Sequence, residues 1–229
     1  MQVRLALVPV VALVAVTAPF AQAAPKAKPV CQTISDAKGD TFAVRVQDSQ
    51  GAYGPQEDGL DITSADLASD GKVVTAVVRI AALSRAVATS PQGITVGVDF
   101  SIGSSDSIVR LSAALVSGAA DRFEVSATAA DALPNTPSTY VGEATGIVDA
   151  KAGEVRIHAP AKLLEPYGAL KAGVKLIPSE AQSATASRGV PPITTTPGQP
   201  MTTRGPFADV AAGGKTYVVG TASCVKPGK

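Results

Sequence analysis

The side chains that could do chemistry in this chain are one histidine, two cysteines and dispersed carboxylates. His158 is the only histidine, so a catalytic triad would have to use it as its base. It ends the segment Glu154 to His158, where strand alternation puts Val155 and Ile157 on one face and the polar residues on the other. We therefore expect a solvent-facing histidine. The sequence has no Gly-x-Ser-x-Gly motif for a nucleophile, and one histidine excludes a multi-histidine zinc site.

Carboxylates are the second chemistry. Four aspartates lie around glycines in a segment expected to lead into the first strands: Asp36, Asp40, Asp58 and Asp61. Ca²⁺ takes several oxygen ligands from flexible segments of this kind, so one expectation is a weak calcium site formed by Asp36, Asp40 and Asp61 and completed by Asp209 from the tail. Aspartates also favour turns without any metal, and their spacing does not match an EF-hand. Paired carboxylates for glycoside hydrolysis would meet only in space, and the sequence singles out no pair.

The N-terminus has the pattern of an export signal. Arg4 gives a positive start, residues 5–16 are almost wholly apolar, and Ala21-Gln22-Ala23 places small residues where a signal peptidase cleaves. The apolar stretch is shorter than the roughly 18–20 residues that span a bilayer, and Pro9 interrupts it. We expect residues 1–23 to be a signal peptide, and the protein to be secreted and extracellular, with no membrane anchor after cleavage.

Cys31 and Cys224 are the only cysteines, and they lie near opposite ends of the chain left after cleavage. Exported proteins fold in an oxidising compartment, which favours an intramolecular disulfide between them over two free thiols. Neither cysteine lies in a Cys-x-x-Cys motif or near the histidine, so a metal or redox role has no support. The disulfide would tie the N-terminal approach to the last strand.

Charge and length limit the partners. Twenty basic residues stand against nineteen acidic ones, and loss of Arg4 with the signal makes the counts equal. The charges are dispersed, so the electrostatic footprint of a nucleic-acid-binding protein is missing. Residues 24–229 are enough for one β-sandwich with a real core, and a single domain is the simplest interpretation.

Turn residues separate short stretches rich in Val, Ile, Thr and Ala, a pattern typical of antiparallel sheets. The clearest signal is Asp70-Gly71, which predicts a tight hairpin before residues 73–80, and a second hairpin is expected at 149–153. Further strands are predicted at 94–102, 107–116, 122–128, 140–148, 154–158, 174–177 and 216–221. The fold class is therefore all-β, an antiparallel β-sandwich of jelly-roll or immunoglobulin-like arrangement.

Two segments depart from the strand pattern. Residues 161–165, after Pro160, predict one short helix. Residues 179–206 are dominated by Ser, Thr, Pro and Gly and predict a long exposed loop. Loops of this length in a compact domain are either functional or mobile, so the segment is a candidate contact surface, with mobility as the alternative.

Several short motifs resemble a known group of domains. They are Asp36-Ala37-Lys38-Gly39-Asp40, then Leu60-Asp61-Ile62, the run from Gly153 to Pro160 with Leu163 beyond it, and the tail from Ala208 through Tyr217 to Cys224. Their order resembles secreted bacterial β-sandwich domains related to family 9 carbohydrate-binding modules and the DOMON group, and the tail is similar to the ending of secreted actinobacterial proteins of that type. The resemblance implies a sandwich fold and, in members that bind sugar, stacking aromatic side chains. This chain departs from that pattern, because it has no Trp and only 4% aromatic residues.

The function that these observations favour is a secreted, non-catalytic binding or adhesion module. It would contact a cell-envelope polysaccharide or protein through the loop at 179–206 and through strand edges. No cofactor is required, with calcium the one candidate. Two alternatives stay open: a secreted hydrolase that depends on carboxylates alone, and a structural or antigenic protein without a small-molecule site.

Overall fold

A computed structural model describes residues 28–39, 60–83, 93–116, 118–131, 138–185 and 207–229. The expected signal peptide, Asp40 and Asp58 lie outside the described residues. No helix in the described ranges is long and apolar enough to cross a membrane.

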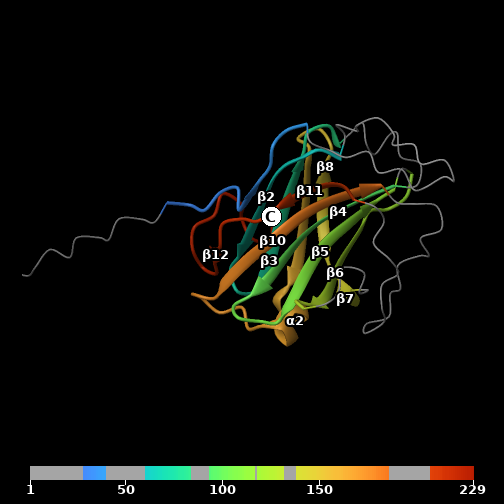
Figure 1. The fold of residues 1–229 in the computed structure, drawn as a ribbon. Coiled ribbons are helices and arrows are strands. Elements are labelled where there is room, and N and C mark those ends of the chain that lie inside the picture. The colour runs from blue at the N-terminus through green and yellow to red at the C-terminus, as the bar shows by residue number, and fades with distance from the viewer. Residues whose placement is uncertain (1–27, 40–59, 84–92, 117, 132–137, 186–206) are drawn as a thin grey trace, which may run out of the picture.

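The described residues form two antiparallel sheets packed face to face, which confirms the predicted all-β sandwich (Figure 1). The five-stranded sheet has the order β1-β2-β3-β9-β8, and the seven-stranded sheet has the order β11-β10-β4-β5-β6-β7 with β12 paired to β10. Their bounds are β1 Ile34–Ser35, β2 Ile62–Ser69, β3 Val73–Ile80, β4 Ile94–Ile102, β5 Ser107–Leu115, β6 Arg122–Ala129, β7 Thr139–Glu143, β8 Thr145–Asp149, β9 Glu154–Pro160, β10 Lys175–Thr185, β11 Phe207–Ala212 and β12 Tyr217–Val218.

The core lies between the sheets and follows from strand alternation. In β4 the inward residues, from Ile94 through Phe100 to Ile102, are all at most 2% exposed. Val155 and Ile157 of β9 point inward from the opposite sheet and are fully buried, as predicted. Each such side chain removed from water contributes about 1.5–3 kcal/mol to folding.

The hairpin predicted at Asp70-Gly71 connects β2 to β3. Gly71 has a φ of 85°, a conformation that glycine adopts without strain. Asp70 Oδ1 accepts hydrogen bonds from Lys72 N at 2.9 Å and Val73 N at 3.0 Å, and these bonds hold the pKa of Asp70 below its usual value. The hairpin at 149–153 is confirmed in the same way, because Asp149 Oδ1 accepts a hydrogen bond from Ala152 N at 2.9 Å.

One predicted strand is two. Residues 140–148 contain β7 of the seven-stranded sheet and β8 of the five-stranded sheet, so the chain changes sheet at Ala144. Just after this change of sheet, the ring of Phe123 packs closely against Gly146. A Cβ on Gly146 would lie 2.3 Å from Cε1 of Phe123. A period of two along the sequence does not reveal such a change of sheet.

The predicted start of the loop at 179–206 is wrong, because the strand before it is longer than expected. β10 runs on from Lys175 to Thr185, so the first residues assigned to the loop belong to a strand, and β11 follows at 207–212. The strand continues past Pro178 because the pairing shifts its register between Pro178 and Glu180, and at such an irregularity a strand tolerates a residue without an N–H. Residues 186–206 lie outside the described residues. The predicted helix is confirmed as α2, Ala161–Leu164, followed by the 3₁₀ turn η2, Glu165–Tyr167.

Candidate functional site

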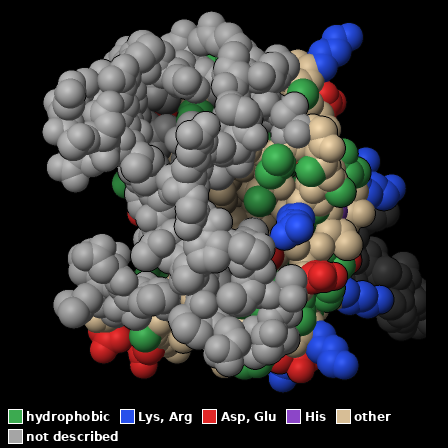
Figure 2. Space-filling view, turned by 90° about the vertical axis from the view of Figure 1, so that its right-hand side faces the viewer, with side chains coloured by type: hydrophobic (Ala, Val, Ile, Leu, Met, Phe, Trp, Pro, Cys, Tyr) green, Lys and Arg blue, Asp and Glu red, His purple; other side chains and the backbone are tan. Residues whose placement is uncertain are grey.

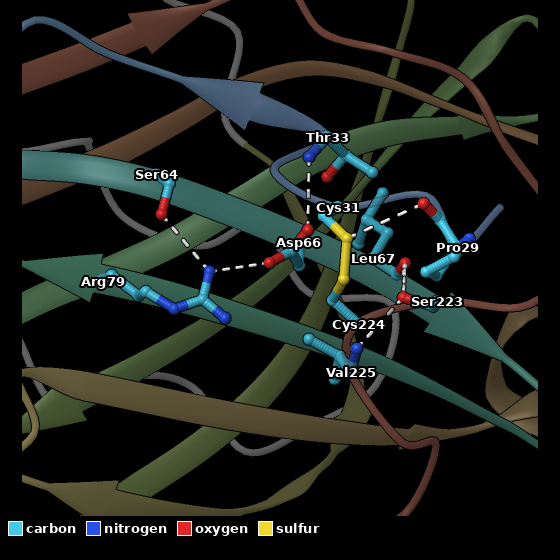
Figure 3. The surroundings of a disulfide bond; sticks show 10 residues. All are labelled: Pro29, Cys31, Thr33, Ser64, Asp66, Leu67, Arg79, Ser223, Cys224 and Val225. Carbon is cyan, nitrogen blue, oxygen red and sulfur yellow. Dashed lines mark hydrogen bonds and ion pairs between the residues drawn. A yellow bond between two sulfur atoms is a disulfide. The ribbon is translucent and has the colours of Figure 1, made fainter.

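The disulfide between Cys31 and Cys224 is present, as predicted (Figure 3). It holds residues 222–229, which we call the C-terminal strap, beside the N-terminal segment. Val30 N donates to Ala222 O at 2.9 Å, and Cys224 N donates to Val30 O at 3.2 Å. Further along, Gly228 N donates to Thr75 Oγ1 at 2.9 Å, so the strap lies on the outer face of the five-stranded sheet.

The prediction of a solvent-facing His158 is wrong. The side chain is only 9% exposed, and its Nδ1 lies 3.0 Å from Thr75 Oγ1, the atom to which Gly228 of the strap donates. Arg156, on the same face, donates to the Lys229 carbonyl at 3.3 Å. Alternation placed His158 on the outer face correctly, but the strap closes that face. Burial, and secondarily the charge of Arg156, lowers the pKa of His158.

This lowered pKa predicts a loss of stability in mild acid. The unfolded chain takes up a proton on His158 near pH 6.5 and the folded chain only at lower pH, so the unfolded state binds more protons in that interval. The contribution is present above the unfolded pKa and is lost as the pH falls towards the lowered folded pKa. The melting temperature of the wild type should therefore fall more between about pH 7.5 and about pH 5.5 than that of His158→Gln. Equal falls in the two proteins would contradict this assignment.

Three of the four residues of the expected calcium site, all but Asp40, are described, and each accepts a hydrogen bond from a backbone amide. Asp36 Oδ1 accepts from Ala37 N at 3.0 Å, Asp61 Oδ1 accepts from Gly39 N at 2.9 Å, and Asp209 Oδ2 accepts from Ile62 N at 2.6 Å. Asp209, on strand β11, thus lies against the residue after Asp61. Among the described residues, which do not include Asp40, no three His, Cys, Asp or Glu side chains are grouped so that they could hold a metal ion. Calcium binding stays a prediction.

The outer face of the seven-stranded sheet carries a second polar arrangement, which we call the polar belt. Cross-strand register aligns its members in two adjacent rows over β10, β4, β5, β6 and β7. The first row is Glu180, Asp99, Arg110, Ser126 and Tyr140, and the second is Gln182, Gly97, Ser112, Glu124 and Glu143.

Charge pairing organises one end of the belt. Arg110 donates from Nε to Asp99 Oδ1 at 2.5 Å and from Nη2 to Oδ2 at 2.6 Å, a bidentate pair. Its Nη2 also lies 3.6 Å from Glu180 Oε1, which accepts a hydrogen bond from Gln182 Nε2. Towards the other end, Ser112 Oγ donates to Glu124 Oε1 at 3.3 Å.

The belt is more buried than the outer face of a sheet usually is. Asp99 and Ser112 are 2% exposed, Ser126 is 1% exposed, and Gln182 is 5% exposed. Ser126 Oγ and Gln182 Oε1 are nevertheless without a hydrogen-bond partner among the described residues. A buried polar atom left unpaired costs about 1–3 kcal/mol, so two in one belt need an explanation.

Burial also changes the acid–base behaviour of the belt. It raises the pKa of Glu124, against the opposing effects of the Ser112 hydrogen bond and nearby arginines. It raises the pKa of Tyr140 as well, with Glu143 and Glu124 adding to the effect. Sequence reasoning did not find this site. Alternation could have placed each residue on the outer face, but the register that aligns five strands was not readable.

The neighbouring side of the molecule carries mixed charge. Figure 2 shows hydrophobic side chains grouped within the described surface there, with Lys and Arg interspersed among Asp and Glu around them. In that view the described surface has no concentrated patch of one charge sign.

Comparison of the chain with protein-family models, with curated proteins and with solved structures finds no match. The candidate site therefore rests on the geometry given above.

Proposed function

We propose that this protein is a secreted, non-catalytic binding module that holds a cell-envelope polysaccharide on the polar belt. The observation that carries the proposal is the pair of buried atoms Ser126 Oγ and Gln182 Oε1, which have no hydrogen-bond partner in the described part of the chain and lie on the outer face of one sheet. A hydroxyl-rich ligand would supply the missing hydrogen bonds and offset the cost of leaving them unmade.

Their spacing favours an extended ligand. Gln182 is on β10 and Ser126 is on β6, with β4 and β5 between them. Three strand spacings separate the two side chains by about 14 Å, too far for one small molecule to bond both. A polymer lying across the strands would reach both through hydroxyl groups, without the stacking aromatics that the sequence lacks.

Secretion is the other half of the proposal. The disulfide and the sequence pattern of residues 1–23 both support it, since disulfides persist in oxidising compartments outside the cytosol. A relation to family 9 carbohydrate-binding modules or the DOMON group, and contact through residues 186–206, stay predictions.

Gly97 provides the test, because it lies in the middle of the belt with no side chain. Its φ is not positive, and a Cβ there would lie 3.0 Å from the Leu111 carbonyl oxygen and 3.2 Å from Ser112 Cβ, so β5 must shift by a few tenths of an ångström to admit a side chain. Gly97→Val should add bulk between the two ends of the belt and weaken polysaccharide binding at least about tenfold in calorimetric titrations.

The matched control is Thr95→Val, on the same strand and the same face but exposed and outside the belt. It should bind like the wild type. Melting temperatures of both variants would show that they are folded. Failure of the wild type to bind any envelope polysaccharide, or equal binding by Gly97→Val, would contradict the proposal.

A carboxylate-dependent hydrolase is the second candidate, and one observation favours it. Glu124 and Glu143 are directly opposite on β6 and β7, which puts their Cβ atoms about 4.5–5.5 Å apart, and burial raises the pKa of Glu124. Incubation of the protein with the polysaccharides that it binds should release no shorter sugars if it is non-catalytic. Release that Glu124→Gln abolishes would establish the hydrolase instead.

A further inference from the structure

The donors and acceptors of the belt indicate which chemical groups its ligand carries; this inference rests on the proposed function. Gln182 Oε1 is a carbonyl oxygen and can only accept, while the Nε2 of the same amide already donates to Glu180. The β6–β7 end holds two carboxylates, Glu124 and Glu143, beside Ser126 Oγ, which has no partner within the described ranges. Carboxylate and amide oxygens accept hydrogen bonds, and a hydroxyl oxygen can do so too. These groups are therefore complementary to hydrogen-bond donors on the ligand.

The charges of the belt also favour a ligand that carries hydrogen-bond donors. The belt contains four carboxylates and one arginine, and that arginine is engaged in a bidentate pair with Asp99 at the β4–β5 position. At the β6–β7 end the two carboxylates Glu124 and Glu143 face one nearby arginine, Arg122, so negative charges outnumber positive ones there. An ammonium group has three donors, no acceptor and a positive charge, which complements that end in both respects.

We propose that the polysaccharide carries free amino groups, and that one ammonium binds between Glu124 and Glu143 with Ser126 Oγ as a further acceptor. The ligand class is an amino-sugar polymer that is not fully N-acetylated. Its hydroxyl groups bond the Gln182 end of the belt.

The protonation of Glu124 predicts a pH dependence of binding that tests this inference. The titratable and charged groups around Glu124 are Arg110 on β5, Arg122 on β6, and Tyr140 and Glu143 on β7. Burial raises the pKa of Glu124, and a bound cation favours its ionised form. Affinity for an amino sugar should therefore increase as the pH rises through the raised pKa of Glu124, and Glu124→Gln should remove that component.

The experiment compares oligomers of glucosamine with the same oligomers fully N-acetylated, by calorimetric titration of the chain from residue 24 onward. The wild type should bind the amino form at least about tenfold more tightly. Glu124→Gln should abolish that preference and keep any binding of the acetylated form. Glu165→Gln is the matched control, because it removes an exposed carboxylate of η2 that is not a member of the belt, and it should change nothing.

Ser126→Ala separates a binding role from a structural one. It removes a buried hydroxyl that has no partner among the described residues, so the melting temperature should stay the same or rise. Binding of the amino form should nevertheless weaken severalfold. A variant that loses stability and keeps its affinity would contradict the assignment, and this test remains valid if Glu124→Gln does not fold.

The outcomes distinguish the two proposals. Equal affinity for both oligomers would overturn the ammonium inference and leave the polysaccharide proposal standing. No affinity for either oligomer, together with none for other envelope polysaccharides, would overturn both. Tighter binding of a lysine-rich peptide than of the glucosamine oligomer would overturn the sugar as the source of the ammonium.

Discussion

Replacing both cysteines, Cys31→Ser with Cys224→Ser, should lower the free energy of unfolding by about 5 kcal/mol. The two residues are 193 positions apart, so the disulfide closes a loop of nearly the whole folded chain and restricts the unfolded state accordingly. Chemical denaturation of the variant and of the wild type measures the difference directly.

The same substitution should detach the strap. Without the disulfide, the strap is held by hydrogen bonds to the five-stranded sheet, among them Gly228 N to Thr75 Oγ1, and by the buried side chain of Val225. The His158 side chain should then be exposed, and its pKa should return towards the ordinary value when followed by NMR. A control with Thr221→Val keeps the disulfide and should keep the depressed pKa. Unchanged stability and an unchanged His158 pKa in the cysteine variant would show that the strap holds without its covalent link.

Arg110→Met should lower the free energy of unfolding by about 3–5 kcal/mol. Asp99 is 2% exposed, and removing the arginine takes away a bidentate pair while the carboxylate stays buried. The cost is therefore that of a buried carboxylate that loses its bidentate cation rather than of a surface ion pair.

Arg122→Met is the matched control, because Arg122 lies on the same outer face but is exposed. Its effect on unfolding should be within about 0.5 kcal/mol. Replacing both members of the pair, Arg110→Met with Asp99→Val, should recover much of the stability. If Arg110→Met and Arg122→Met had equal effects, the buried pair would not be a structural element of the belt.

The features that the sequence predicted correctly are local ones. The hairpin at Asp70-Gly71 needs only a glycine with positive φ and an aspartate that accepts hydrogen bonds from the amides two and three residues on, and both requirements are met within four residues. The inward faces of β4 and β9 follow equally from alternation. The disulfide followed from the cysteine count and the expected compartment.

The features that were missed depend on residues far apart in the chain. His158 is buried because the strap returns from some seventy residues downstream, and alternation carries no information about what covers a face. The break between β7 and β8 depends on Phe123 packing against Gly146. The belt depends on the register of five strands, which sets Arg110 opposite both Asp99 and Ser126.

The most direct test of a binding site on the polar belt is an NMR titration of the chain from residue 24 onward, labelled with ¹⁵N, with a glucosamine oligomer. The account predicts that amide shifts change along the belt, at Gln182, Gly97 and Ser126, and stay constant in the strap around Cys224. Shifts confined to the five-stranded sheet and the strap would contradict it, as would a spectrum that the oligomer leaves unchanged.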